Sequence, residues 1–186
     1  MRVISGVYGG RRLAAPRGRS TRPTPERVRE AVFSILADVA DETVLDLFAG
    51  SGAMGIEAMS RGARHVTLVD SSAAAIAAIR SNVRALGIAA EVLHQRALPF
   101  LRNARTYGRQ YDLVFLDPPY GQAAALGPEL AGALTPVLAA GARVVVESDP
   151  RAPLELGLTS PSDERRYGDT RIEIFHMPDG NPLNGS

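Results

Sequence analysis

The chain has 186 residues, 45% of them hydrophobic and 22% charged, as expected for about one ordinary globular domain. It contains no cysteine, which excludes disulfides, a thiol nucleophile and cysteine-ligated metal, and its histidines are too scattered for us to expect any metal site. No apolar run is long enough to span a membrane and no signal-peptide core follows Met1, so we expect a cytoplasmic protein that does not contact the membrane.

The positive charge is concentrated at the N-terminus. The whole chain carries a net charge of only +1, but residues 1–30 contain eight arginines against two glutamates, and the chain has no lysine. Arginine pairs with phosphate and stacks on bases, so we expect the segment to bind nucleic acid. The residues expected to contact phosphate are Arg11, Arg12, Arg22, Arg27 and Arg29. A solvated basic tail, or an arginine bias of the genome, would give the same composition.

The first forty residues are predicted to form a small extension. Residues 2–14 indicate two short strands that pair as a β-hairpin around glycines, and residues 15–25 indicate an exposed loop. A helix then begins, with Thr24 as its cap and Pro25 at its first position. An apolar face with helical spacing (Val28, Ala31, Val32 and Ile35) leaves Arg27 and Arg29 off the buried side. We therefore expect residues 1–40 to be a basic RNA-binding extension.

Strands and helices alternate from residue 41. Strands are expected at 43–48, 65–70, 90–96, 111–117 and 142–148, with helices at 52–61, 72–86, a short one ending near 101, and 126–138. This alternation predicts an α/β fold with a parallel sheet covered on both faces. Residues 158–166 and 170–177 are expected to add an antiparallel hairpin at one edge. The catalytic domain would span residues 41–178, followed by a flexible tail at 179–186.

The segment from Asp46 to Gly55 is predicted to be a cofactor loop. It joins the first strand of the alternating region to a helix, and its glycines let the backbone approach a ligand closely. Gly50, Gly52 and Gly55 match the dinucleotide pattern, and Asp70 follows where a carboxylate would accept ribose hydroxyls. A nicotinamide cofactor is thus one alternative. Asp46 favours another, because it would repel a pyrophosphate and attract the ammonium of an amino-acid cofactor.

A second loop, Asp117-Pro118-Pro119-Tyr120, follows the strand expected at 111–117. Two prolines fix the backbone and carry no N–H, so this stiff rim offers only acceptors beside an aromatic ring. An exocyclic NH2 could donate its protons to the Asp117 carboxylate and the Pro118 carbonyl while Tyr120 stacks on the heterocycle. The loop is therefore a candidate site for an amine substrate. A simple proline turn with a helix-capping aspartate would have the same residues.

Taken together, the two loops resemble those of Rossmann-like S-adenosylmethionine-dependent methyltransferases that modify exocyclic amines. The whole chain from about residue 2 to 177 is similar to the bacterial 16S ribosomal RNA (guanine-N2)-methyltransferase D family. That resemblance implies a mostly parallel seven-stranded sheet and a catalytic loop at Asp117, Pro118, Pro119 and Tyr120. It implies cofactor contacts from Asp46, Phe48, Gly50, Ser51, Gly52, Asp70, Ser71 and Ala97. The segments that carry it are Ile4–Gly6, Gly10–Leu13, Arg22–Thr24, Arg27–Glu30, Phe33, Leu45–Arg61, Asp117–Tyr120 and Val145–Ser148.

The resemblance also implies the substrate, which is a guanosine of small-subunit ribosomal RNA, conventionally position 966, in the assembling subunit. It implies S-adenosylmethionine as the cofactor, and we expect a monomer. One departure is that Arg96 stands where related enzymes place Asp or Asn near the adenine, so a backbone contact from Ala97 is expected instead. The alternatives are an adenine-N6 nucleic acid methyltransferase, a protein-glutamine methyltransferase and a non-catalytic ribosome-assembly factor.

Overall fold

The computed structural model describes residues 1–16, 24–119, 123–158 and 161–179, apart from the side chains of 123–125. It divides into two units, Met1–Ala97 and Leu98–Ser186. The seven strands follow the order β3-β2-β1-β4-β5-β7-β6. The pairs β1–β2, β2–β3 and β4–β5 are parallel, whereas β5–β7 and β6–β7 are antiparallel. The predicted α/β fold, with a mostly parallel seven-stranded sheet and an antiparallel C-terminal hairpin, is confirmed.

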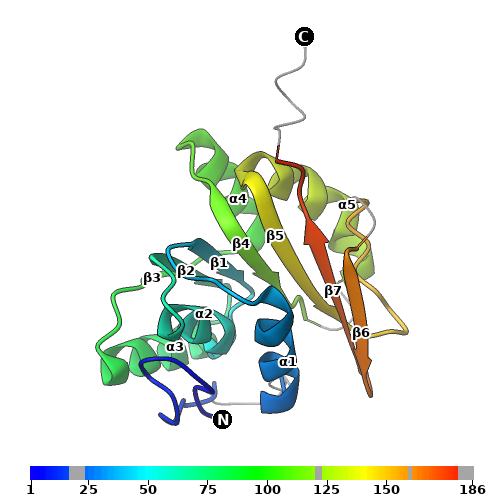
Figure 1. The fold of residues 1–186 in the computed structure, drawn as a ribbon. Helices are drawn as coiled ribbons and strands as arrows, with labels where there is room; N and C mark the ends of the chain where they lie inside the picture. The colour runs from blue at the N-terminus through cyan, green and yellow to red at the C-terminus, as the bar shows by residue number, and fades with distance from the viewer. Residues whose placement is uncertain (17–23, 120–122, 159–160, 180–186) are drawn as a thin grey trace. The chain divides into compact units, whose positions relative to one another are not determined.

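The first unit contains three parallel strands, β1 (Thr43–Leu47), β2 (His65–Asp70) and β3 (Glu91–His94). Helices α2 (Ala53–Ser60) and α3 (Ala73–Leu86) pack against them, as the ribbon in Figure 1 shows. The helix α3 begins at Ser72, whose hydroxyl accepts a hydrogen bond from the amide of Ala75, and ends at Gly87 in the left-handed conformation. These local signals fix the direction in which the chain returns to the next strand.

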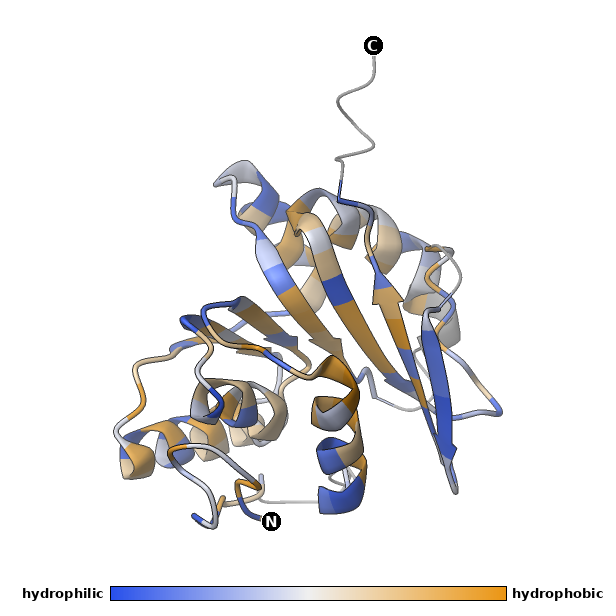
Figure 2. Cartoon of the chain, in the orientation of Figure 1, coloured by the Kyte–Doolittle hydropathy of each residue, from blue (hydrophilic) through white to orange (hydrophobic). Residues whose placement is uncertain are grey.

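The second unit contains α4 (Ala97–Thr106, which begins at the last residue of the first unit), β4 (Tyr111–Leu116), α5 (Ala123–Leu134) and a 3-10 turn, η1 (Thr135–Val137). The strands β5 (Leu138–Ser148), β6 (Asp163–Tyr167) and β7 (Thr170–His176) complete it. Figure 2 shows β4, β5 and β7 as mostly hydrophobic and β6 as hydrophilic. The strand β6 is at the end of the strand order, and its exposed charged side chains discourage pairing with another chain.

The N-terminal segment differs in detail from the prediction. Residues Arg2 and Arg12 form an isolated antiparallel bridge, so residues 1–13 double back as a short hairpin-like segment. Helix α1 spans Glu26–Leu36 and is capped by Pro25 without a side-chain hydrogen bond to the cap. The predicted cap at Thr24 is therefore wrong by one residue, because the Pro25 carbonyl accepts the first helical hydrogen bond, from Val28. The expected domain boundary near residue 40 stays a prediction.

This N-terminal segment shares a hydrophobic core with the helices of the first unit. Val3 and Leu13 are buried against Ala53, Ile56 and Ile88. Gly6 approaches α2 so closely that a Cβ there would overlap the carbonyl of Ser60. Contact this close is open only to glycine, which also adopts the positive φ of 80° found at Gly6. The segment is thus packed through its backbone onto α2.

Candidate active site

The loop between β1 and α2 has an unusual backbone. Phe48, Gly50 and Gly52 have positive φ angles of 72°, 57° and 78°. The amides of Phe48 and Ala49 both donate to the Val69 carbonyl at 3.0 Å, which ties the loop to the end of β2. A Cβ added at Gly50 would meet no atom within 4 Å, so the space beside this residue is open. The loop therefore leaves room for a ligand to approach the backbone near the start of α2.

Asp46 lies inside β1 and is 4% exposed. Its Oδ2 atom accepts a 2.9 Å hydrogen bond from the amide of Gly55, in the first turn of α2. Gly55 packs so tightly on β2 that a Cβ there would lie 2.4 Å from Leu68 Cδ2. Burial raises the pKa of Asp46 to about 7, the Gly55 amide opposes this rise, and the nearby Asp70 adds to it. A cationic ligand group would reverse the shift.

Asp70 stands at the end of β2 and organises the same loop. One carboxylate oxygen accepts from the amide of Gly50 and the other from the amide of Ser72, each at 2.8 Å. The neighbouring Ser71 is exposed, and its carbonyl lies 3.0 Å from His94 Nε2. The structure thus brings the predicted residues Asp46, Gly50 and Asp70 into one hydrogen-bonded loop system. Half-buried Asp70 retains exposed surface through which it can reach a ligand.

The remaining predicted cofactor residues of the first unit have different surroundings. Ser51 is 9% exposed, and its hydroxyl donates to the sulfur of Met1 at 3.7 Å. Phe48 is half-buried in the loop. Ala97 is half-buried at the start of α4, directly after the exposed Arg96. Their contacts with a cofactor remain predictions, since these positions alone do not define a ligand.

The second predicted loop directly follows β4 in the second unit. The strand ends at Leu116, and Asp117 and Pro119 are exposed whereas Pro118 is buried. Tyr120 lies outside the described residues. An exposed carboxylate beside two prolines keeps the acceptor-only character that the sequence indicated. This loop can present oxygen atoms to an amine donor.

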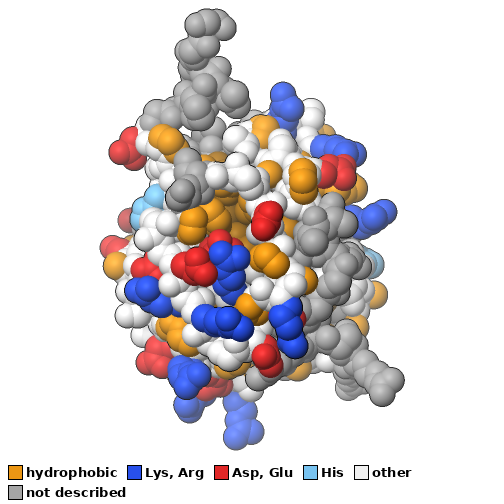
Figure 3. Space-filling view, turned by 90° about the vertical axis from the view of Figure 1, so that its right-hand side faces the viewer, with side chains coloured by type: hydrophobic (Ala, Val, Ile, Leu, Met, Phe, Trp, Pro, Cys, Tyr) orange, Lys and Arg blue, Asp and Glu red, His pale blue; other side chains and the backbone are white. Residues whose placement is uncertain are grey.

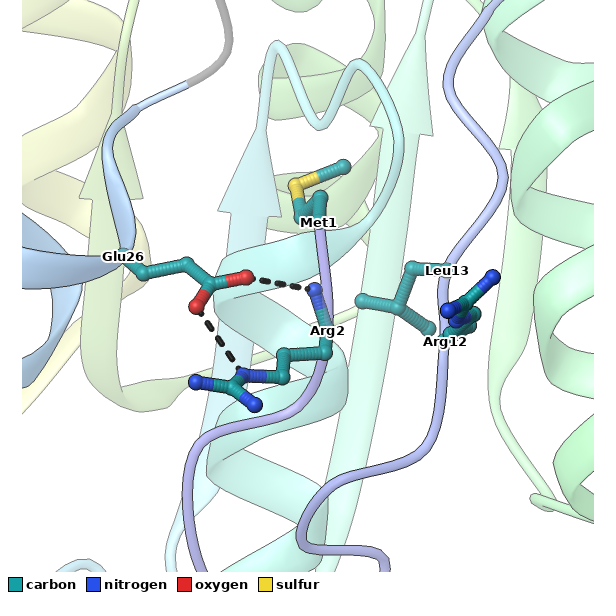
Figure 4. Close-up of a pocket in the computed structure, with 5 residues that line it drawn as sticks. All are labelled: Met1, Arg2, Arg12, Leu13 and Glu26. Atoms are coloured by element: carbon teal, nitrogen blue, oxygen red, sulfur yellow. Dashed lines mark hydrogen bonds and ion pairs between the residues drawn. The ribbon is translucent and has the colours of Figure 1, made fainter.

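Three of the predicted RNA-binding arginines are exposed, namely Arg11, Arg12 and Arg27. Arg22 lies outside the described residues. A pocket with a volume of about 400 Å³ is lined by Met1, Arg2, Arg12, Leu13 and Glu26. Figure 4 shows the Glu26 carboxylate turned toward Arg2, to which it is hydrogen-bonded, while Arg12 lines the other side. In the space-filling view of Figure 3, basic and acidic side chains are interspersed on the face turned to the viewer.

The prediction that Arg29 is exposed is wrong. Its side chain is fully buried and donates from Nη2 to the Arg2 carbonyl at 2.7 Å, while Nη1 lies 3.7 Å from Glu57. Burial lowers the pKa of Arg29, and the Glu57 carboxylate opposes that effect. The buried face of α1 includes Phe33 and Leu36, so it lies closer to position 29 than the predicted face did. A side chain with no exposed surface cannot contact a phosphate, so Arg29 has a structural role.

Two buried polar residues were missed by the sequence reasoning. Glu57 on α2 accepts hydrogen bonds from the amides of Ile4 and Ser5, at 2.7 and 3.0 Å. Asn82 on α3 binds the backbone of Ala14. Both occupy the apolar faces of their helices, and a polar residue at such a position is the signal that could have found them. They attach the N-terminal segment to the first unit.

Within the described ranges, no three histidine or acidic side chains are grouped in a way that could hold a metal ion. None of the described helices is both long and apolar enough to cross a membrane.

The fold and the loop between β1 and α2 together define the class of protein. It is a Rossmann-like S-adenosylmethionine-dependent methyltransferase. A solved structure described as putative methyltransferase yhhF from Escherichia coli superimposes with a TM-score of 0.84 and 32% identity, over 97% of this chain and 99% of that one. The Thermus thermophilus hypothetical protein TTHA0928 gives a TM-score of 0.81 and 32% identity, over 94% and 98% of the two chains. These likenesses extend over nearly the whole molecule.

The family model described as Conserved hypothetical protein 95 matches residues 1–176. Ribosomal RNA small subunit methyltransferase D from Escherichia coli strain K12 is 40% identical over 64% of this chain and 60% of its own length. The putative rRNA methyltransferase YlbH of Bacillus subtilis strain 168 is 44% identical over 64% of this chain and 67% of its own. The matched part thus spans about two thirds or less of these curated relatives. The chain belongs to this methyltransferase D family, as the sequence resemblance predicted.

Proposed function

We propose that this protein transfers a methyl group from S-adenosylmethionine to the exocyclic N2 amine of a guanosine in small-subunit ribosomal RNA. The observation that carries the proposal is the exposed Asp117 carboxylate, next to two prolines at the end of β4. The names of the methyltransferase D relatives support the ribosomal substrate. Position 966 is the nucleotide that the family implies, and the acting form is a cytoplasmic monomer.

The loop after β1 fits the cofactor. The open space beside Gly50 admits a ligand close to the backbone, and the Asp70 carboxylate stands where ribose hydroxyls would donate to it. The buried Asp46 carboxylate suits an amino-acid ammonium, whose charge would stabilise the ionised form. Phe48, Ser51, Gly52, Ser71 and Ala97 complete the cofactor contacts in this proposal.

Bound S-adenosylmethionine supplies an electrophilic methyl on a sulfonium. Guanine N2 is a weak nucleophile because its lone pair is delocalised into the ring. The Asp117 carboxylate and the Pro118 carbonyl accept hydrogen bonds from the two amine N–H groups and hold the nitrogen pyramidal, so that the lone pair points at the methyl. An N–C bond forms as the S–C bond breaks, and the surplus amine proton then leaves to Asp117 or water. Positioning of this kind can supply up to roughly 7–11 kcal/mol of the barrier reduction.

The target base must leave its stack to reach the Asp117 loop. Tyr120, which lies outside the described residues, stacks on the extruded guanine in this proposal, a contact worth roughly 1–3 kcal/mol. Exposed Arg11, Arg12 and Arg27, together with Arg22, contact phosphates. Arg29 is not part of this surface because it is buried. The N-terminal segment thus supplies RNA affinity and the Asp117 loop supplies the chemistry.

The proposal is tested by incubating unmodified small ribosomal subunits with S-adenosylmethionine that carries a labelled methyl group. We expect label to enter the subunit RNA, and S-adenosylhomocysteine to inhibit the transfer by competing for the loop after β1. Large subunits serve as the matched RNA control and should remain unlabelled. Absence of label from small subunits, with cofactor binding intact, would contradict the proposal and favour a non-catalytic assembly factor.

A further inference from the structure

The Asn82 side chain on α3 is 3% exposed and makes three hydrogen bonds to the backbone of other segments. Its oxygen accepts from the amide of Ala14 at 2.7 Å, and its nitrogen donates to the Ala14 carbonyl at 3.0 Å and to the Ser51 carbonyl at 2.9 Å. An amide N–H can only donate and a carbonyl can only accept, so these partners fix the orientation of the carboxamide. Asn82 therefore links two backbone segments through a buried side chain that uses both of its donors.

The two ends of this link belong to the two functional parts of the first unit. Ala14 follows the exposed Arg11 and Arg12 of the N-terminal segment, whereas Ser51 lies between Gly50 and Gly52 in the cofactor loop. Met1 makes a second connection, since its sulfur accepts from the Ser51 hydroxyl and its carbonyl accepts from the amide of Leu13. The N-terminal segment is thus connected to Ser51 of the loop by hydrogen bonds through both Asn82 and Met1.

Other contacts hold the N-terminal segment on α2 without involving Asn82. Glu57 accepts from two amides of the segment, and the Ser60 carbonyl and hydroxyl accept from the amides of Val7 and Tyr8. Val3 and Leu13 add buried apolar contacts. We expect these anchors to keep the segment on α2 when Asn82 is changed, because none of them involves the Asn82 side chain. The role of Asn82 can therefore be separated from the docking of the segment.

We propose that Asn82 is a positioning residue that couples RNA binding by the N-terminal segment to cofactor binding by the loop after β1. The inference rests on the proposed function for its two ligands. RNA bound to Arg11 and Arg12 also restricts the backbone of Ala14. The hydrogen bonds of Asn82 to Ala14 and Ser51 then restrict the backbone of Ser51. Coupling between two binding sites is reciprocal, so the cofactor strengthens RNA binding by the same factor. The enzyme then favours cofactor loading on the RNA-bound form.

The test measures the dissociation constant of the unmodified small subunit with and without saturating S-adenosylhomocysteine. For the natural chain we expect the ligand to tighten RNA binding at least about fivefold, the lower end of typical couplings. In Asn82→Ala the factor should fall, because the carboxamide link between Ala14 and Ser51 is removed and only the contact between the Met1 sulfur and the Ser51 hydroxyl remains. Asn103→Ala, which removes an exposed amide on α4, should keep the natural factor.

A second measurement uses the natural chain alone, so it does not depend on the folding of a variant. Hydrogen exchange of the Ala14 amide should slow when S-adenosylhomocysteine binds, because the loop then orders the Asn82 carboxamide that accepts from this amide. The amide of Gly87, at the far end of α3, should exchange at an unchanged rate.

The outcomes distinguish the inference from the function on which it rests. A natural chain that binds neither small subunits nor S-adenosylhomocysteine would overturn the proposed function and the coupling with it. Three results would overturn the coupling alone. The natural chain could bind both ligands with no change in RNA affinity on adding S-adenosylhomocysteine, Asn82→Ala could keep the natural coupling factor, or the exchange rate of the Ala14 amide could stay unaltered. A purely structural Asn82 would lower stability without changing the factor.

Discussion

The loops after β1 and β4 both follow parallel strands, but their carboxylates differ. Asp46 is buried in the first loop system, and its Oδ2 atom accepts from the amide of Gly55. Asp117 is exposed at the second, beside prolines that offer no donor. In the proposed function the buried carboxylate orders the loop after β1 and faces the cofactor ammonium, whereas the exposed one receives the substrate amine. Changes at the two positions should therefore affect different steps.

The largest effect is expected for Asp117→Ala, which removes the carboxylate of the second loop. Methyl transfer should fall by at least roughly 10²–10³-fold, a loss comparable to that of one preorganised catalytic hydrogen-bond partner. The affinity for S-adenosylhomocysteine should stay nearly natural, because Asp117 is not part of the first loop. Single-turnover kinetics measure the rate of methyl transfer, and calorimetry measures the affinity for S-adenosylhomocysteine. Glu129→Ala, an exposed acid on α5, is the control, and an Asp117→Ala chain with natural turnover would refute the mechanism.

The next largest effect is expected on stability, at the buried structural carboxylate of Glu57. Glu57→Gln removes the buried negative charge nearest to Arg29, and breaking a buried pair in this way costs about 3–5 kcal/mol. Glu129→Gln, which alters the exposed pair with Arg102, should cost less than about 1 kcal/mol. Urea unfolding measures both. Equal losses of unfolding free energy in the two variants would show that a buried carboxylate does not stabilise the fold more than an exposed one.

A pH-dependent effect of similar or smaller size is expected at Asp46. Its pKa is raised from 3.8 to about 7 in the folded chain, so the folded state holds the proton more tightly than the unfolded state. The resulting stability is complete below about pH 4 and is lost as the pH rises through about 7, a change of roughly 4 kcal/mol at most. Asp46→Asn should remove this dependence. The measurement is the urea midpoint of the natural chain and of Asp46→Asn from pH 5 to 8. The same change of midpoint with pH in both would contradict this prediction.

The smallest effect is expected on the exposed arginines. Changing Arg11 and Arg12 to Gln should reduce the salt dependence of subunit binding by a slope of about one per lost phosphate contact. Affinity for S-adenosylhomocysteine alone should not change. Arg80→Gln, on the exposed side of α3, is the matched control. The measurement is the dissociation constant at several salt concentrations, and an unaltered slope would remove these side chains from the RNA surface.

Features that depend on neighbouring residues were predictable from the sequence. The strand β2 has the predicted bounds, and Ser72 caps α3 because its hydroxyl reaches an amide three residues away. The position of the loop between β1 and α2 was predicted from its glycines, and its contacts with a cofactor stay a prediction. Its positive φ at Phe48 was not, because a β-carbon disfavours that conformation.

Features that depend on distant partners were not predictable. Arg29 is buried because Glu57 and the Arg2 carbonyl are brought to it by the fold. Asn82 finds Ala14 at a separation of 68 residues. The strand β5 begins at Leu138 and not near 142, because an irregularity in its pairing with β4 accommodates Gly141, whose φ is 70°. No local pattern specifies such partners.

The most direct test of the central claim is the identity of the methylated nucleoside. Small-subunit RNA labelled by the protein is digested to nucleosides and analysed by mass spectrometry, with the Asp117→Ala chain run in parallel. The account predicts that the label appears in N2-methylguanosine and is lost with the variant. Label in N6-methyladenosine would contradict the assignment of guanine N2 as the acceptor.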